Sequence, residues 1–315
     1  MACAPPHVRH AVAEEPFVLS PGPTPSEREA LAVPGNSSVR ASPATSGRTA
    51  IERGPGRRMP LVHGTIAGRP TLLLLDTGAY DHLLEGWFAS ALQDAEASGK
   101  SAAVIDHANR RVPMDRWSSV TLALDGIGAL GTIRPLTTRD QTPGPRAFGI
   151  GGILSPQKLT DGGAVVIDFP AGEMARETED HATTRLAGHS TSLGTAVRCG
   201  GAYIIEATIE GKEARLLVDT GAFATDLKAT SMPGRALLGR SSVSRDIYAI
   251  GGAVQTRALA DARVTIAALT KVLDVSIVTD GGSSGRCAGD GVVGMDVLGG
   301  CVLVIEATRM RIACD

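Results

Sequence analysis

The sequence predicts a mostly β protein built from two similar lobes, with only short helices. Short apolar runs separated by turn residues continue from residue 59 to the end of the chain, and their pattern occurs twice. Glycine accounts for 38 of the 315 residues, which suits a fold of many short strands and tight turns. Aromatic residues make up only 3%, so the core must consist mainly of Val, Leu, Ile and Ala.

Residues 1–58 are predicted to form a disordered N-terminal segment. They are rich in Pro, Ser, Ala and Arg, and their apolar residues follow neither a helical nor a strand period. Three interpretations are open: a tether, a propeptide, or a tail without function.

A β-hairpin is predicted at the start of each lobe. Residues 61–75 and 202–218 each read as two strands around a tight glycine turn. Each hairpin runs directly into the same four residues, Asp-Thr-Gly-Ala, at 76–79 and 219–222. When these two motifs are aligned, the turn glycines align as well, without a gap.

Later segments repeat in the same order, which indicates an internal duplication. Residues 152–159 and 291–298 are each predicted to be a strand that turns into a short helix. The predicted lobes are 59–169 and 199–315, joined by a polar linker at 170–198. The remaining predicted elements are the buried strands 164–168 and 301–306, the strands 117–124 and 262–269, and a helix at 83–98.

The charge pattern argues against two classes of partner. The formal net charge is −2 and no long run of one sign occurs, whereas nucleic acids and membrane surfaces attract clustered Lys and Arg. No apolar run approaches the roughly 20 residues of a transmembrane helix. The seven histidines show no metal-binding spacing, so neither a metal nor another cofactor is expected.

The five cysteines leave the compartment open. Cys199, Cys287, Cys301 and Cys314 allow two disulfides with three pairings, and buried free thiols in a cytoplasmic protein are the alternative. Cys3 lies in a Met-Ala-Cys context that resembles a bacterial lipoprotein cleavage site, or matches it by chance. The lipoprotein interpretation predicts a cell-envelope or secreted protein, where disulfides persist.

The repeated Asp-Thr-Gly stretch is the strongest chemical signal in the chain. A single copy is a weak signal because Asp and Gly both favour turns. Here each copy follows an apolar strand, which delivers Asp76 and Asp219 to places where an isolated charge is costly. Glycine permits a sharp turn and a close approach of other backbone, and the Thr hydroxyl can brace the turn.

If the two loops face each other, the two carboxyls cannot both ionise, and the pair holds one proton between them. Such a pair suits peptide hydrolysis. The ionised carboxylate takes a proton from a water molecule, and the protonated carboxyl donates to the peptide carbonyl oxygen. This chemistry requires no metal and no covalent intermediate.

On these motifs the chain resembles the retropepsin-like aspartic peptidases, in a bacterial-style single chain that carries both lobes. The resemblance covers roughly 59–315 and includes the apolar-apolar-Gly element at 291–294 and the Ala that follows each Asp-Thr-Gly. It implies a two-lobed aspartic-protease fold and aspartic endopeptidase activity. It also implies Asp76 and Asp219 as the catalytic dyad, Thr77, Gly78, Thr220 and Gly221 as its support, and Ala79, Ala222, Ile250, Gly251 and Gly252 as substrate-binding residues.

The family also carries a glycine-rich hairpin, the flap, that closes over an extended peptide. Residues 248–254 fit this element, and residues 106–111 lie at the same distance from the first motif and fit a second hairpin tip. Ordinary surface hairpins are the alternative for both. The resemblance implies an extended polypeptide substrate, and a monomer is sufficient because one chain supplies both aspartates.

Two departures from the family pattern keep other functions open. Ser155 stands where the apolar-apolar-Gly pattern expects Gly, and Pro156 follows it, so the packing beneath Asp76 is expected to differ. Asp81 lies close enough in sequence to perturb the titration of the pair, or is a solvated side chain. The alternative functions are a peptide-binding module in the cell envelope that retains the cleft without turnover, and a structural envelope protein.

Overall fold

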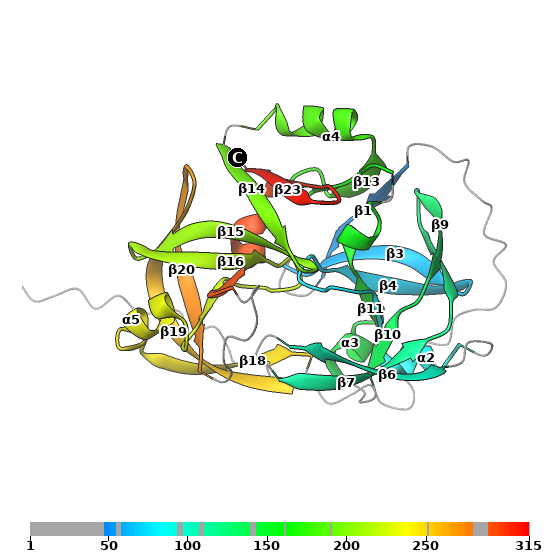
Figure 1. Ribbon diagram of the computed structural model, residues 1–315, viewed down its shortest axis with the longest axis horizontal. Helices are drawn as coiled ribbons and strands as arrows, with labels where there is room; N and C mark the ends of the chain where they lie inside the picture. Colours follow the sequence, from blue (N-terminus) through cyan, green and yellow to red (C-terminus); the bar gives the residue numbers. More distant parts are fainter. Residues whose placement is uncertain are drawn as a thin grey trace, which may run out of the picture. The chain divides into compact units, whose positions relative to one another are not determined.

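The computed structural model describes residues 47–54, 58–92, 97–106, 110–138, 143–160, 162–189, 191–250, 252–279 and 289–314. All of these residues belong to one compact unit. Strands dominate the unit and form two large sheets, and the helices are short (Figure 1). The prediction of a mostly β protein is therefore confirmed for the part of the chain that is described.

The first sheet is built from residues before 155. Its path begins at the β6–β7 hairpin and ends at the β8–β9 hairpin, and β2 pairs with β3 beside this path. In spatial order its strands are β6 (Ala97–Ile105), β7 (Arg111–Trp117), β10 (Leu136–Thr138), β5 (Leu83–Leu84), β11 (Ile150–Leu154), β4 (Arg69–Leu75), β3 (Pro60–Ile66), β8 (Val120–Leu124) and β9 (Gly128–Ile133), with β2 (Glu52–Arg53) at the side.

The second sheet takes most of its strands from residues after 190. In spatial order they are β1 (Arg48–Ala50), β13 (Glu173–Glu177), β12 (Ala164–Asp168), β22 (Cys301–Ile305), β23 (Arg309–Cys314), β14 (Thr191–Cys199), β15 (Ala202–Ile209), β16 (Lys212–Val218), β21 (Gly291–Val293), β17 (Asp226–Lys228), β20 (Leu269–Val278), β19 (Gly252–Ile266) and β18 (Val243–Ala249).

The two predicted hairpins are present, with the same turn geometry. Ala67 and Gly68 link β3 to β4 with φ of 51° and 75°, and Glu210 and Gly211 link β15 to β16 with φ of 51° and 74°. Two consecutive positive φ values define the turn that matches the natural twist of a hairpin, and they explain the glycine at the second position.

The same strand order recurs in both sheets around these hairpins. The path β6-β7-β10-β5-β11-β4-β3 in the first sheet corresponds to β18-β19-β20-β17-β21-β16-β15 in the second. The pairing directions also agree. For example, β4 is parallel to β11, and β16 is parallel to β21. The strand that turns into a short helix is likewise found twice, as β11 followed by η2 (Pro156–Lys158) and β21 followed by α6 (Met295–Leu298).

The predicted helix at 83–98 is wrong. Leu83 and Leu84 form β5, which pairs with β10 and β11. Among the described residues of this range, only the single turn α2 (Gly86–Ala89) is helical. Strand β6 then begins at Ala97. The apolar residues at helical spacing are used instead to bury a central strand, because pairing with two neighbours overrides a weak helical preference.

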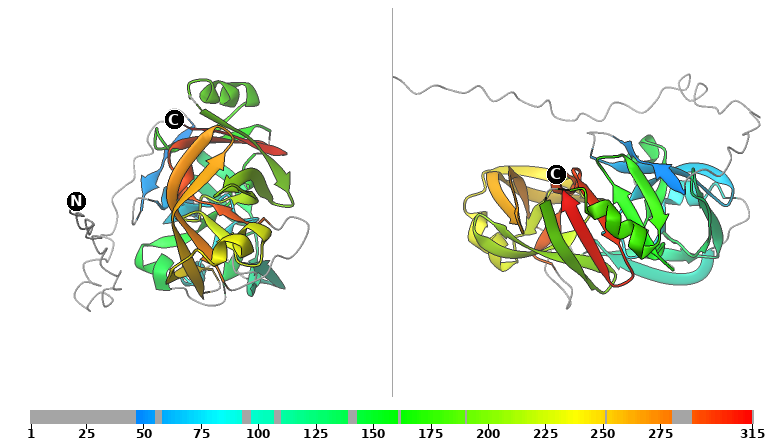
Figure 2. Two further views of the ribbon diagram at one scale, coloured as in Figure 1. Left: turned by 90° about the vertical axis from the view of Figure 1, so that its left-hand side faces the viewer. Right: turned by 90° about the horizontal axis from the view of Figure 1, so that it is seen from above.

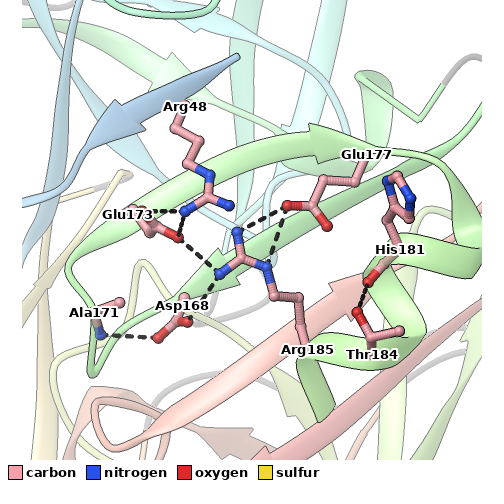
Figure 3. A network of polar contacts seen from close by, with 8 residues as sticks. All are labelled: Arg48, Asp168, Ala171, Glu173, Glu177, His181, Thr184 and Arg185. Atoms are coloured by element: carbon pink, nitrogen blue, oxygen red, sulfur yellow. Dashed lines mark hydrogen bonds and ion pairs between the residues drawn. The ribbon is translucent and has the colours of Figure 1, made fainter. Parts of the chain in front are cut away.

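The described residues of the predicted linker, 170–189 and 191–198, lie mostly in regular elements. They include β13, α4 (Glu179–Leu186) and most of β14. Figure 3 shows Arg185 of α4 among the carboxylates of Asp168, Glu173 and Glu177, at 3.9, 3.0 and 2.9 Å. Seen from above, α4 lies over the neighbouring strands (Figure 2), and its buried Ala182 packs against apolar side chains of β12 and β22.

Strand β12, from the first predicted lobe, pairs with β22, from the second. One hydrophobic cluster draws side chains from both sheets. The division into lobes at 59–169 and 199–315 stays a prediction.

The predicted disordered segment extends too far toward the C-terminus. Strand β1 pairs with β13, and β2 pairs with β3, although both lie within residues 1–58. Thr49 and Ile51 are buried. Strands of two or three residues are too short to show a period in the sequence. Residues 1–46 and 55–57 lie outside the described residues.

The other helices in the described part of the chain are α3 (Pro143–Ala147) and α5 (Met232–Leu238). Among the residues that the structure describes, no helix is long and apolar enough to cross a membrane.

Candidate active site

The two Asp-Thr-Gly loops begin where β4 and β16 end, and neighbouring strands hold them. The backbone N–H of Asp76 donates to the carbonyl of Leu154 at 3.0 Å. The backbone N–H of Asp219 donates to the carbonyl of Val293 at 3.1 Å. In each sheet the strand parallel to the hairpin therefore fixes the backbone of the aspartate.

The two threonines join the loops by four reciprocal hydrogen bonds. Thr77 Oγ1 donates to the carbonyl of Val218 at 2.7 Å, and Thr220 Oγ1 donates to the carbonyl of Leu75 at 2.8 Å. Each hydroxyl also accepts the backbone N–H of the other threonine at 3.1 Å. Both side chains are completely buried. Figure 1 shows the β3–β4 and β15–β16 hairpins approaching each other where these loops meet.

The motif glycines make room for the opposite carboxyl. A Cβ atom on Gly78 would lie 2.6 Å from the carboxyl carbon of Asp219. A Cβ atom on Gly221 would lie 2.6 Å from the carboxyl carbon of Asp76. Both distances are far below van der Waals contact, so any larger residue would displace the facing aspartate.

The two carboxyls lie together, as the repeated motif predicts. The side chains of Asp76 and Asp219 are hydrogen-bonded to each other. Gly78 and Ala79 donate their backbone N–H groups to Asp76 Oδ1 at 2.7 and 2.9 Å. Gly221 and Ala222 donate in the same way to Asp219 Oδ1, at 2.8 and 3.2 Å.

This environment favours a retained proton. Burial raises the pKa of Asp76 well above its ordinary value, and the charge of Asp219 and the hydrogen bond to it raise that pKa further. The N–H groups of Ala79 and Gly78 act in the opposite direction. Both aspartates still keep part of their surface accessible to solvent. The pair is thus arranged to hold a proton at a pH where an isolated aspartate is ionised.

Beneath the loops lie four residues that the sequence reasoning did not assign to the site. Ser155 donates its backbone N–H to His82 Nδ1 at 3.1 Å. At the matching place Gly294 donates its backbone N–H to Thr225 Oγ1 at 3.3 Å. Asp296 accepts two hydrogen bonds from Thr225, both at 2.8 Å. These residues are His82, Gln157, Thr225 and Asp296. The sequence offered one indication of such a role: His82 and Thr225 stand at the same distance after their Asp-Thr-Gly motifs.

Protonation of His82 is expected to destabilise the fold at acidic pH. Burial lowers the pKa of His82 to about 4, from an ordinary 6.5, with a smaller contribution from Lys158 and an opposing one from Asp81. Between these two pKa values, the unfolded chain binds a proton at His82 and the native state does not. Stability should fall as the pH decreases from about 6.5 and level off below about 4, with a total loss of about 3 kcal/mol.

Urea unfolding of the wild type and of a His82→Thr variant between pH 4 and 7 measures this effect. The variant carries the residue found at position 225 and has no titratable group there. The difference in unfolding free energy between the two proteins should change with pH in the stated direction. A constant difference would contradict the assignment.

Two further hairpins, β6–β7 and β18–β19, lie side by side in the lower part of Figure 1. Ile250 of the second hairpin packs against an apolar cluster of the first sheet that includes Leu83, Met114 and Leu136. Gly252 begins β19, and Gly251 lies outside the described residues. The predicted second tip at 106–111 is also a hairpin connection, of which 107–109 lie outside the described residues.

Arg110 ties these hairpins together. Its guanidinium donates to the carbonyls of Gly252 and Ala253, at 3.0 Å each. The same guanidinium pairs with Asp106 at 2.7 Å, and the carboxyl of Asp106 is buried. A charged group bound on both sides in this way favours one arrangement of the two hairpins.

Removal of this tie is expected to loosen the β18–β19 hairpin. In an Arg110→Met variant, backbone amide exchange in β18 and at the start of β19 should increase about tenfold, which corresponds to about 1.4 kcal/mol. Hydrogen–deuterium exchange with mass spectrometry measures the change. The control is Arg111→Met, which removes an exposed neighbouring charge. Equal exchange in both variants would show that Arg110 does not hold the hairpin.

Within the described ranges, no three His, Cys, Asp or Glu side chains lie close enough together to hold a metal ion. A search against protein-family models and a search of curated proteins found no match to this chain. The function of the site therefore has to follow from its own geometry.

Proposed function

We propose that the chain is an aspartic endopeptidase that hydrolyses peptide bonds with a water molecule held between Asp76 and Asp219. One observation carries this proposal. Two carboxyls from equivalent loops are hydrogen-bonded to each other, and each is held by two backbone N–H groups. One carboxyl of the pair can hold a proton while the other stays ionised and can accept a second proton.

The proposed reaction uses both states of the pair. The ionised carboxylate accepts a proton from the water, and the water oxygen attacks the carbonyl carbon of the peptide bond. The protonated carboxyl donates its proton to the carbonyl oxygen, which gives a tetrahedral intermediate. The C–N bond then breaks as the nitrogen receives a proton from the pair, and one hydroxyl of the intermediate returns its proton to the pair as it becomes the carbonyl oxygen of the new carboxyl group. The elements of water are divided between the new carboxyl and the new amine, and the pair is left with one proton.

We also propose a two-lobed aspartic-protease fold of the retropepsin-like kind, derived from an internal duplication. The recurrent strand path supports this proposal, as do the matched hydrogen bonds from Asp76 to Leu154 and from Asp219 to Val293. An extended peptide would pair with the backbone of the hairpins. Ala79, Ala222, Ile250 and Gly252 are the described residues proposed to contact it. A monomer supplies the whole site.

The test is digestion of a mixed-sequence peptide library between pH 3 and 7, read by mass spectrometry, with wild type and an Asp219→Asn variant. We expect new termini in the wild-type digest alone. Pepstatin is a secondary probe, because retropepsin-like enzymes can resist it. No cleavage by a folded wild type at any pH, together with binding of a statine-type peptide, would support the peptide-binding alternative instead.

We propose that the protein works in the cell envelope or outside the cell. Cys301 and Cys314, directly opposite each other on β22 and β23, form a disulfide, and Cys199 is also disulfide-bonded. Disulfides persist in oxidising compartments. Cys3 and Cys287 lie outside the described residues.

Reduction should therefore destabilise the protein. Opening the Cys301–Cys314 bond, whose partners are 13 residues apart, is expected to cost about 3 kcal/mol of unfolding free energy. Guanidinium unfolding of oxidised wild type and of a Cys301→Ala, Cys314→Ala double variant measures this loss. A Cys199→Ala variant serves as the control for the other disulfide. An unchanged midpoint in the double variant would contradict a stabilising role.

A further inference from the structure

The two catalytic loops are supported differently at one backbone position. In the second loop, the backbone N–H of Met295 donates to the carbonyl of Ala222 at 2.9 Å. Ala222 in turn donates its own N–H to Asp219 Oδ1. In the first loop the residue at the place of Met295 is Pro156, which lies two residues after the strand carbonyl that holds the aspartate. Proline has no N–H, so the first loop cannot form this bond.

Two side chains next to Pro156 donate hydrogen bonds in place of the missing backbone N–H. Ser155 Oγ donates to the carbonyl of Ala79 at 2.8 Å. Gln157 Nε2 donates to the same carbonyl at 2.5 Å. Both side chains are almost fully buried, with 0% and 3% of their surfaces exposed. The carbonyl of Ala79 is thus held by two side chains where its counterpart is held by one backbone group.

The Gln157 amide does more than replace one bond. Its nitrogen also lies 3.3 Å from the carbonyl of Thr77 and 3.2 Å from the carbonyl of Gly201, in the turn between β14 and β15. Its oxygen is buried and has no hydrogen-bond partner among the described residues. The side chain therefore acts here as a donor, and a carboxylate in its place would face three carbonyl oxygens.

We propose that Gln157, assisted by Ser155, is a positioning residue for Asp76. It holds Ala79 so that the Ala79 N–H points at Asp76 Oδ1, at 2.9 Å. It compensates for Pro156 and links the first loop to the β14–β15 turn. This inference rests on the proposed peptidase function. It also accounts for Ser155, which then supports the catalytic loop and is not a sign of lost catalysis.

Three variants test the inference in the full-length protein. Gln157→Met removes the donor at nearly constant size, and kcat should fall at least about tenfold with KM changed less than about twofold. Pro156→Ala, added to Gln157→Met, restores a backbone N–H and should recover most of the lost kcat. Pro156→Ala alone is the control and should leave kcat unchanged.

Gln157→Glu supplies a readout that a purely structural role would not move. A protonated glutamic acid can donate to the Ala79 carbonyl, whereas the carboxylate cannot. Activity of this variant should therefore be confined to the acidic side of the wild-type profile. If Gln157→Met fails to fold, the pH profile of Gln157→Glu decides the question.

The outcomes separate this inference from the proposed function. An inactive wild type would overturn the proposed function, and the ¹³C NMR titration of the Asp76 carboxyl in wild type and Gln157→Met would then test the positioning. A changed titration supports the inference and an unchanged one overturns it. With an active wild type, an unchanged kcat in Gln157→Met, or a wild-type pH profile in Gln157→Glu, overturns the inference alone.

Discussion

Replacing Asp219 by Asn is expected to reduce kcat for peptide cleavage by at least about 10³-fold, since general acid–base transfer by such groups contributes about 10²–10⁴-fold. The Asn side chain keeps the shape but cannot exchange a proton with water. Asp76→Asn should have the same effect on cleavage, because the reaction needs both members of the pair. Steady-state cleavage of a peptide identified in the library digest measures both losses.

The Asp76→Asn substitution should not weaken the fold at neutral pH. The pKa of Asp76 is raised in the native state. Its stabilising contribution is therefore complete below the unfolded pKa of about 3.8 and is lost as the pH rises through the native value. At pH 7 the wild type must keep this carboxyl protonated or bear the cost of a buried charge, and Asp76→Asn has no such cost. The thermal midpoint of Asp76→Asn at pH 7 should therefore equal or exceed that of the wild type, and this difference in midpoint should disappear below about pH 3.8.

Asp81→Asn is the matched control for these variants. Asp81 belongs to the same loop and pairs with Arg116 at 3.4 Å, outside the hydrogen bonds of the aspartate pair. Its substitution should leave kcat within a few-fold of the wild type. Near wild-type cleavage by folded Asp76→Asn or Asp219→Asn would rule out a shared proton as the source of activity.

Replacing Thr77 by Val is expected to destabilise the protein by about 2–6 kcal/mol, because a buried polar group that loses its partner costs about 1–3 kcal/mol. The hydroxyl of Thr77 serves two groups of the other loop, the carbonyl of Val218 and the N–H of Thr220. Valine has nearly the same shape, so lost packing contributes little. Denaturant unfolding at neutral pH measures the effect.

Thr77→Ser is the control, since it keeps the hydroxyl and should cost less than half as much. Thr220→Val should match Thr77→Val, because Thr220 bonds to Leu75 and Thr77 in the same way. Equal stability of the Val and Ser variants would show that the reciprocal hydrogen bonds do not hold the loops together.

The hairpins were predictable because their signals are local. Alternating burial and a glycine at the second turn position lie within 15 or so residues, and both copies carry them. The helix expected at 83–98 failed for the opposite reason. Leu83 and Leu84 form a strand because they pair with β10 and β11, whose residues come more than 50 positions later. No local pattern records that pairing.

The support beneath the aspartates could be predicted only in part. The repeated motif places Asp76 and Asp219 and explains their glycines and threonines. The role of Gln157 could not be predicted, because it replaces a hydrogen bond that is seen only in the folded second loop, from the Met295 N–H to the Ala222 carbonyl. In retrospect the signal was a proline aligned with Met295, since a missing N–H requires another donor nearby.

The most direct test of the central claim is a ¹³C NMR titration of the Asp76 and Asp219 carboxyls in the folded protein, assigned with the two Asn variants. If the pair shares a proton, the two resonances will shift together, and one proton will remain bound at a pH well above 3.8. If both carboxyls lose their protons independently near 3.8, the pair holds no shared proton, and the mechanism proposed here is wrong.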